Sequence, residues 1–233
     1  MAPLTYHVLR CAPGTRPEQV DWATVPAARI ATYQWLGGGY EPAAEARLVF
    51  VPDFGFILRM SCNEQDPKAV YTEYNQPVYT DSCLEFFAAW VDGDPRYMNM
   101  EMNARGTLLS CLGPGRGDRI PVADLTGGQI PTVTGSLTEG GSLSIGGCQA
   151  SGWCQANGHA TGWWHVTALI PTALLARVYG VPEARFGSGM TFRGNFYKCG
   201  DETPIPHYGM WNPVGTEKPD FHRPEFFGTF LVD

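Results

Sequence analysis

The sequence predicts an all-β protein: a single-domain β-sandwich of jelly-roll type with one short helix. Glycine and proline contribute 28 and 19 of the 233 residues, and only 17% are charged, which favours short strands and many turns over long helices. Two segments, "YMNMEMN" and "GMTFRGNFYKC", alternate apolar and polar residues with a period of two, as half-buried strands do. Roughly ten such short strands with glycine-rich connections predict a sandwich rather than a helical fold.

The first clear elements form a hairpin. "ARLVFVPDFGFILRMSCNE" predicts strands over residues 46–51 and 56–62, joined by a Pro-Asp-Phe-Gly turn. "PVYTDSCLEFFAAWVDGD" predicts a buried strand over residues 83–91 and a turn at residues 92–95. In "YMNMEMN", the three methionines should face the core, and Asn99, Glu101 and Asn103 should face a groove or solvent.

Residues 113–162 are rich in Gly, Ser and Thr, and "GPGRGDR", "LTEGGSLSIGG" and "QANGHATG" indicate loops between short strands. "WWHVTALIP" then predicts a strand, and "TALLARVYG" predicts the one helix, which Gly180 ends. In "GMTFRGNFYKC", Phe192 and Phe196 should point to the core, whereas Arg193 and Asn195 should point away from it. No repeat or linker divides residues 1–233, which predicts one domain.

Charge argues against two classes of partner. The formal net charge is -7 and the sequence has no basic cluster, so neither nucleic acid nor an anionic membrane is expected to be the main partner. No apolar run has the length of a membrane-spanning helix, and the N-terminus lacks the basic and apolar regions of a leader peptide. We therefore expect a cytoplasmic protein. The protein partner, if any, is unknown.

The seven cysteines are expected to be reduced. Their number is odd, and no C-x-x-C pair occurs, so we predict no disulfide and no zinc site. No cofactor is expected. "DPKAVYTEYN" and "DGDP" leave structural calcium open, although they contain few clustered carboxylates.

Sugar recognition needs two kinds of group in one concave site. Aromatic rings pack against the C–H faces of the sugar, while amides, carboxylates and guanidinium groups bind its hydroxyls. The polar faces of the two alternating strands supply the second kind. The proline-rich segment near the C-terminus supplies Tyr208, Trp211, Phe221 and His222 on irregular backbone.

Three segments carry a family resemblance. "PVYTDSCLEFF" resembles the aromatic, Asp-Ser, Glu-Phe signature of carbohydrate-binding module family 9, and "HYGMWNP" and "FHRPEFFG" resemble its C-terminal pattern. The resemblance implies a β-sandwich that holds a mono- or disaccharide, often at a chain end, between two aromatic rings. It implies that Tyr79 and Phe221 are those rings and that Glu85 accepts a sugar hydroxyl.

The predicted function is therefore non-catalytic carbohydrate binding, with a small sugar or glycan chain end as the ligand. Trp211, Phe221 and His222 should form one wall of the pocket, opposite Tyr79. The complete predicted ligand-binding set is Tyr79, Glu85, Glu101, Asn103, Arg193, Asn195, Trp211, Phe221 and His222.

Two other functions stay open at this stage. The same sandwich can be a sugar-active enzyme or enzyme subunit that uses Glu85, Glu101, His207 or His222 in acid-base or metal chemistry. For a metal, the histidines would need partners such as Asp201, Glu202 and Asp220, but their spacing matches no standard motif. Alternatively, the terminal aromatic residues form a protein interface that buries Trp211.

Overall fold

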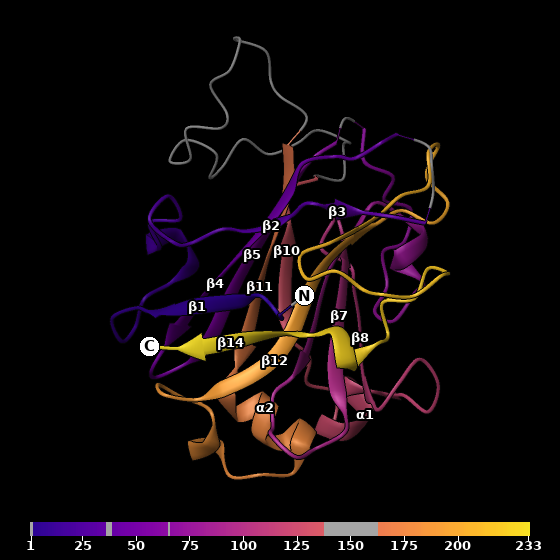
Figure 1. Ribbon diagram of the computed structural model, residues 1–233. Helices are drawn as coiled ribbons and strands as arrows, with labels where there is room; N and C mark the ends of the chain where they lie inside the picture. The colour runs from indigo at the N-terminus through magenta and orange to yellow at the C-terminus, as the bar shows by residue number, and fades with distance from the viewer. Residues whose placement is uncertain (1, 36–38, 65, 138–162) are drawn as a thin grey trace.

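The computed structural model describes residues 2–35, 39–64, 66–137 and 163–233, and shows two β-sheets packed face to face (Figure 1). The first, called here the β12 sheet, has the order β14 (Gly228–Val232), β12 (Thr191–Cys199), β6 (Cys83–Ala89), β7 (Tyr97–Asn103), β8 (Leu108–Gly113), β9 (Ile120–Pro121). Adjacent strands along this path are antiparallel. The short strands β13 (Tyr208–Met210) and β3 (Thr32–Tyr33) extend it, since β13 pairs with both β12 and β3.

The second sheet, called the β5 sheet, has the order β10 (Thr132–Gly135), β11 (Trp163–Pro171), β5 (Gly55–Asn63), β4 (Ala44–Val51), with β2 (Ala28–Ile30) on β4. Strand β1 (Thr5–Arg10) joins the two sheets, because its first part pairs in parallel with β14 and its end pairs in parallel with β4. The predicted hairpin is confirmed as β4 and β5. Its turn needs glycine at position 55, where φ is +140° and a Cβ would lie 2.3 Å from the Ile170 carbonyl oxygen.

Helices are short and lie at one end of the sandwich (Figure 1). The predicted helix is α2 (Thr172–Tyr179), and Gly180 ends it in the left-handed conformation, with φ of 68°. A second helix, α1 (Val122–Thr126), corrects the prediction of one, because five residues are too few to show helical periodicity. Single 3-10 turns occur at Pro17–Gln19, Val78–Thr80, Glu183–Arg185 and Pro224–Phe226. No helix of the described residues is long and apolar enough to cross a membrane.

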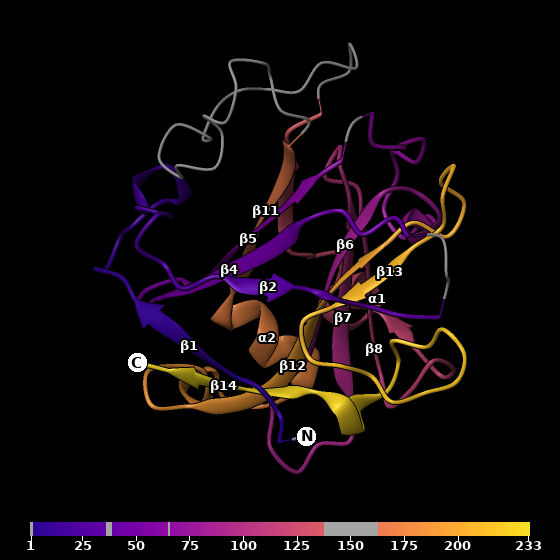
Figure 2. The same cartoon turned by 45° about the horizontal axis from the view of Figure 1, so that its top comes forward.

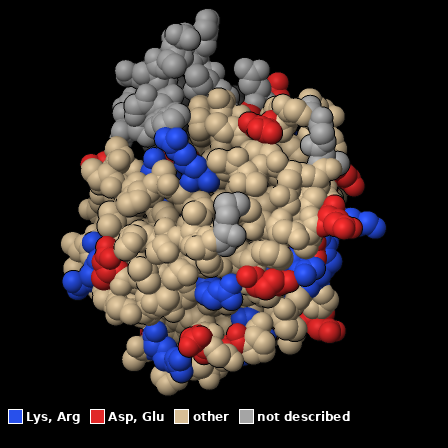
Figure 3. All heavy atoms as spheres, in the orientation of Figure 1, with Lys and Arg blue, Asp and Glu red and all other residues tan. Residues whose placement is uncertain are grey.

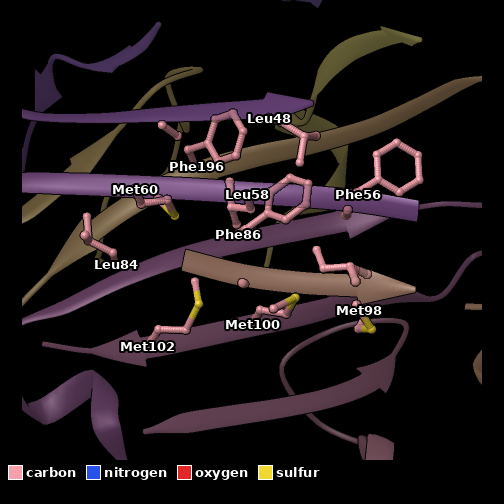
Figure 4. Packing of buried hydrophobic residues seen from close by; sticks show 14 of the residues in the cluster. Leu48, Phe56, Leu58, Met60, Leu84, Phe86, Met98, Met100, Met102 and Phe196 are labelled. Atoms are coloured by element: carbon pink, nitrogen blue, oxygen red, sulfur yellow. The ribbon is translucent and has the colours of Figure 1, made fainter. Parts of the chain in front are cut away.

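The main core lies between the sheets. Met98, Met100 and Met102 of β7 are at most 1% exposed and pack with Phe86 and Phe196 from neighbouring strands (Figure 4). Phe192 also belongs to this core, so the predicted inward faces of β7 and β12 are confirmed. This cluster draws on residues from Tyr6 to Val232. The single-domain assignment for residues 1–233 itself stays a prediction.

The outer face of the β12 sheet is covered by two largely irregular segments, residues 66–82 and 200–227. Their side chains build a second apolar cluster against Phe87, Tyr97 and Tyr197 on the outer face of the strands. Figure 2 shows the C-terminal segment, in yellow, running past β13 and β8 before it enters β14. The two covering segments enclose the candidate site.

The space-filling view shows acidic and basic side chains interspersed on the visible face of the molecule (Figure 3).

Candidate functional site

Strand alternation places polar groups in the middle of the covered outer face. Because Phe86 and the β7 methionines point inward, Glu85 and Phe87 of β6 and Asn99 and Glu101 of β7 point outward. In the strand register, Glu85 lies directly opposite Glu101 on one side and Tyr197 on the other. Two carboxyl groups therefore occupy adjoining positions on rigid strands.

These residues form the floor of a pocket of about 410 Å³. The walls come from the 3-10 turn before β6, the loop after β8 and the C-terminal segment. The strand residues of the lining are Glu85, Phe87, Asn99, Glu101, Leu109, Cys111 and Cys199, and the wall residues are Tyr79, Arg116, Arg119, Asp201, Tyr208, Pro219, Asp220, Phe221 and His222.

The two floor carboxyls are hard to ionise. Glu85 and Glu101 are 3% and 4% exposed. Burial raises the pKa of Glu85 well above its ordinary value, and the neighbouring Glu101 charge adds to the effect. Burial also raises the pKa of Glu101, to about 7, against the opposing effects of the Asn99 hydrogen bond and the Arg119 charge. Burial therefore favours the protonated form of Glu85, which can donate as well as accept a hydrogen bond.

Asn99 links the Glu101 carboxyl to an arginine. Its Nδ2 donates to Glu101 Oε1 at 2.8 Å, and its Oδ1 accepts from Arg119 Nη2 at 2.6 Å. The Arg119 guanidinium lies 4.5 Å from the centre of the Tyr97 ring. Two buried polar atoms of this network, Glu101 Oε2 and Arg119 Nε, have no hydrogen-bond partner among the described residues. One is an acceptor, or a donor when protonated, and the other is a donor.

Two aromatic residues of the pocket lining, Tyr79 and Phe221, come from segments that are far apart in the sequence. Tyr79, from the turn Val78–Thr80, is 40% exposed. Phe221, from the C-terminal segment, is 7% exposed and stacks on Tyr197 with ring centres 4.0 Å apart and planes at 13°. Tyr208 meets Phe221 edge to face at 6.0 Å. The support from Tyr197 and Tyr208 fixes the Phe221 ring.

His222 lines the pocket as a neutral ring. Its Nδ1 lies 2.7 Å from the Tyr97 hydroxyl oxygen, and burial lowers its pKa to about 3, with the nearby Arg119 and Arg116 charges acting in the same direction. The Tyr97 hydroxyl and His222 Nδ1 share this hydrogen bond, and the tautomer of the ring decides which of them donates. Asp220 accepts from Arg116 at 3.0 Å and from the His222 backbone N–H at 3.1 Å. The Arg116–Asp220 pair thus connects the loop after β8 to the C-terminal segment at the rim of the pocket.

The structure brings five of the nine predicted residues together in this pocket: Tyr79, Glu85, Glu101, Phe221 and His222. Whether they bind a ligand stays a prediction. The sequence prediction named Asn99 and Tyr208 but left both out of the ligand-binding set, and it missed Arg116 and Arg119. The only signal for the arginines was their presence in "GRGDR", a loop that directly follows a strand.

Asn103 and Asn195 do not line the pocket, which corrects their inclusion in the predicted ligand-binding set. Asn103 is fully buried and donates to the Tyr71 carbonyl at 2.9 Å and to Asp81 Oδ2 at 3.0 Å. Asn195 donates to the backbone carbonyl of Asn212 at 2.8 Å and accepts from its N–H at 2.9 Å. Both amides serve the loops that cover the sheet, because buried loop backbone needs hydrogen-bond partners.

Trp211 and Arg193 also lie elsewhere, and the prediction that Trp211 forms a pocket wall is wrong. Trp211 is 8% exposed and packs in the main core against Tyr6, Phe196 and Phe230. Its burial within the chain also leaves it unsuitable as the anchor of a protein interface. Arg193 lines a different hollow of about 760 Å³ and donates to the Glu225 and Phe227 carbonyls. That hollow lacks the paired carboxyls.

Candidate metal ligands are sparse among the described residues. His207 and His222 do not share a site, because His207 lies outside the pocket lining and its Nε2 accepts from Lys198 at 2.7 Å. In "DGDP", Asp94 is paired with Arg96 at 2.6 Å. The three-residue group that could hold a metal is Cys83, Glu85 and Cys199. The five described cysteines are free thiols, and Cys148 and Cys154 lie outside the described residues.

Comparisons with known proteins point in one direction. A protein of Bacteroides uniformis ATCC 8492 proposed to bind carbohydrate has a similar structure, with a TM-score of 0.74, 24% identity and full coverage of both chains. A carbohydrate-binding module family 9 protein from Caldicellulosiruptor kristjanssonii, solved with glucose, has a TM-score of 0.60 and 11% identity, covering 99% of this chain and 96% of its own. A carbohydrate-binding module family 9 protein from the same organism, solved with cellotriose, has a TM-score of 0.56 and 10% identity, covering 98% of this chain and 93% of its own.

No curated protein matches. The structural likenesses show the fold, a β-sandwich, at identities too low to carry more. The sequence itself, however, matches the model of carbohydrate-binding family 9 over residues 14–232. That span contains both sheets, the covering loops and every residue of the pocket. With a family match across nearly the whole chain and the same sandwich in solved members, this chain belongs to carbohydrate-binding family 9.

Proposed function

We propose that the 410 Å³ pocket binds a mono- or disaccharide, or the end of a sugar chain, without altering it. The observation that carries this proposal is the pair of unsatisfied buried atoms, Glu101 Oε2 and Arg119 Nε. A buried polar atom without a partner costs free energy, and a ligand that pairs it recovers that cost. A sugar hydroxyl can donate to one of these atoms and accept from the other.

The pocket also suits a sugar in size and shape. A volume of about 410 Å³ is within the range of small-molecule sites, and one or two sugar rings fill such a space. Tyr79 and Phe221 supply apolar faces at the walls, while Glu85 and Asn99 supply further hydrogen-bonding groups on the floor. Stacking removes apolar surface from water, and the floor selects the positions of the hydroxyls.

The family supplies the first ligands to test. Of the two similar family 9 structures from Caldicellulosiruptor kristjanssonii, one is a complex with glucose and the other is a complex with cellotriose. These ligands support a preference of the pocket for glucose units. Tighter binding of cellotriose than of glucose would support a preference for the end of a glucose chain. A chain-end preference would support a role in polysaccharide utilisation.

Isothermal titration calorimetry tests the proposal with glucose, cellobiose and cellotriose, each with and without a chelator. Glu101→Gln and Tyr79→Ala should each weaken the best ligand at least about tenfold, because each removes a central contact. Tyr79→Phe is the matched control: it keeps the ring and should bind within about threefold of the parent. Sugar affinities unchanged in both Glu101→Gln and Tyr79→Ala would refute the pocket assignment.

The alternative function is glycoside hydrolysis, because Glu85 and Glu101 adjoin and a pair of carboxyl groups can hydrolyse a glycosidic bond. The assay is the release of new reducing ends from cellotriose during prolonged incubation. We expect none. Release that Glu85→Gln abolishes would replace the binding proposal with a catalytic one.

A further inference from the structure

Two cysteines that lie far apart in the sequence meet at the edge of the pocket floor. Cys83 begins β6, Cys199 ends β12, and the two are direct partners in the strand register. They are 0% and 1% exposed. Glu85, two residues along β6, projects from the same face. One ligand atom from each, the two Sγ atoms and a carboxylate oxygen, lie within 4.8 Å of one another.

We propose that Cys83, Glu85 and Cys199 bind a thiophilic divalent cation of the zinc type. Two sulfur atoms and one carboxylate oxygen form a donor set that zinc accepts and that calcium and magnesium do not. Bonds of about 2.3 Å to sulfur and 2.0 Å to oxygen place the ligands of one zinc ion less than about 4 Å apart. The observed spacing therefore needs only small side-chain adjustments.

The placement of the three ligands distinguishes them from ordinary core thiols. Cys199 Sγ donates to Glu85 Oε1 at 2.9 Å, so the sulfur already points toward the carboxyl group. All three side chains start from paired strands, which hold the donor atoms in register. Three protein ligands leave one coordination position open, as in zinc sites that bind a further molecule.

Glu85 and Cys199 both belong to the pocket lining, so the proposed cation would lie beside the pocket. A bound cation would thus lie where a ligand of the pocket can reach it. The inference rests on the geometry of these three residues and not on the proposed sugar-binding function, so it is tested without sugar.

The experiment uses untagged, reduced, chelator-treated protein titrated with Co²⁺ and then with Zn²⁺. We expect a sulfur-to-cobalt charge-transfer band in the near ultraviolet that saturates at one equivalent and disappears when Zn²⁺ displaces the cobalt. Cys83→Ser and Cys199→Ser should each weaken binding at least about tenfold. Glu85→Gln should weaken binding but keep the band, since both sulfurs remain.

Two controls isolate the site. Cys111→Ser removes a thiol that lines the same pocket outside the cluster, and it should bind cobalt like the parent. The double variant Cys148→Ser, Cys154→Ser should also behave like the parent. Absence of the band in the parent, its loss in either control, or its persistence at full affinity in both Cys83→Ser and Cys199→Ser would overturn the proposal. So would a Cys83–Cys199 disulfide in protein purified without reductant.

Discussion

The two faces of the β12 sheet are both buried, but different parts of the chain bury them. The inner face carries methionine and phenylalanine and packs against the β5 sheet. The outer face carries carboxyl, amide and thiol groups and is covered by irregular loops, which leave the pocket. The same strands thus hold a stabilising face and a binding face. Substitutions on the inner face should therefore lower stability, whereas substitutions on the outer face should lower ligand affinity.

The inner face should show the largest effect on stability. Phe86→Ala removes a ring that is 1% exposed and packs on Phe196 at 4.9 Å. We expect the free energy of unfolding to fall by about 3–5 kcal/mol, measured by urea denaturation, with the sugar affinity of the folded protein unchanged. Ile120→Ala, at a side chain 48% exposed, is the control and should change stability by less than about 0.5 kcal/mol. A loss below about 1 kcal/mol for Phe86→Ala would contradict this assignment.

Substitutions of Trp211 and Phe221 compare the main core with the pocket within one segment of the chain. Trp211→Ala should cost about 3–5 kcal/mol of stability because it opens a cavity in the main core, yet the folded protein should keep its sugar affinity. Phe221→Ala should weaken sugar binding at least about tenfold. Calorimetry well below each melting temperature separates the two outcomes. Equal losses of affinity in both variants would contradict the placement of Trp211 in the core.

Glu101→Gln should change how stability depends on pH. The pKa of Glu101 rises to about 7 in the folded protein, from 4.5, so the folded state holds the proton more tightly than the unfolded state. Its contribution to stability is complete below pH 4.5 and is lost as the pH rises through 7. The parent should lose on the order of 2–3 kcal/mol between pH 5 and pH 8 from this group.

Unfolding of the parent and of Glu101→Gln at several pH values measures this contribution as a difference. The comparison is needed because His165, His207 and His222 act in the opposite direction. Burial lowers their pKa values to about 4, 4 and 3, so their protonation destabilises the fold as the pH falls below 6.5. The contributions of these histidines to the pH dependence of stability cancel in the difference curve. A flat difference curve would show that Glu101 titrates normally.

Arg116→Ala should have the smallest effect. The side chain is 65% exposed and pairs with Asp220 at 3.0 Å, and exposed ion pairs contribute less than about 1 kcal/mol. Stability should hardly change, while sugar affinity should fall only a few-fold because Arg116 lines the rim. Lys218→Ala is a matched control at a basic residue of the C-terminal segment that does not line the pocket. A tenfold loss of affinity in Arg116→Ala alone would move this arginine from the rim to the centre of the site.

Two strands and their inward faces could be predicted from the sequence alone. Alternation in "YMNMEMN" and "GMTFRGNFYKC" is a local property, so it predicted the inward Met98, Met100, Met102, Phe192 and Phe196 correctly. The family motifs likewise placed Tyr79, Glu85 and Phe221 in one site. Alternation did not reveal that the polar face would be buried too, because loops from elsewhere in the chain cover it.

Which distant residues share a site depends on how the whole chain folds. Trp211 and Phe221 belong to one proline-rich segment, but pairing of β13 with β12 returns the chain to the sheet just before Trp211 and places its ring in the core. The loop after β8 brings Arg119 to Glu101 through Asn99, and strand register brings Cys83 to Cys199. These contacts depend on long-range pairing of strands and on loop paths. Local periodicity carries no information about either, because it reports only which face of its own strand a residue occupies.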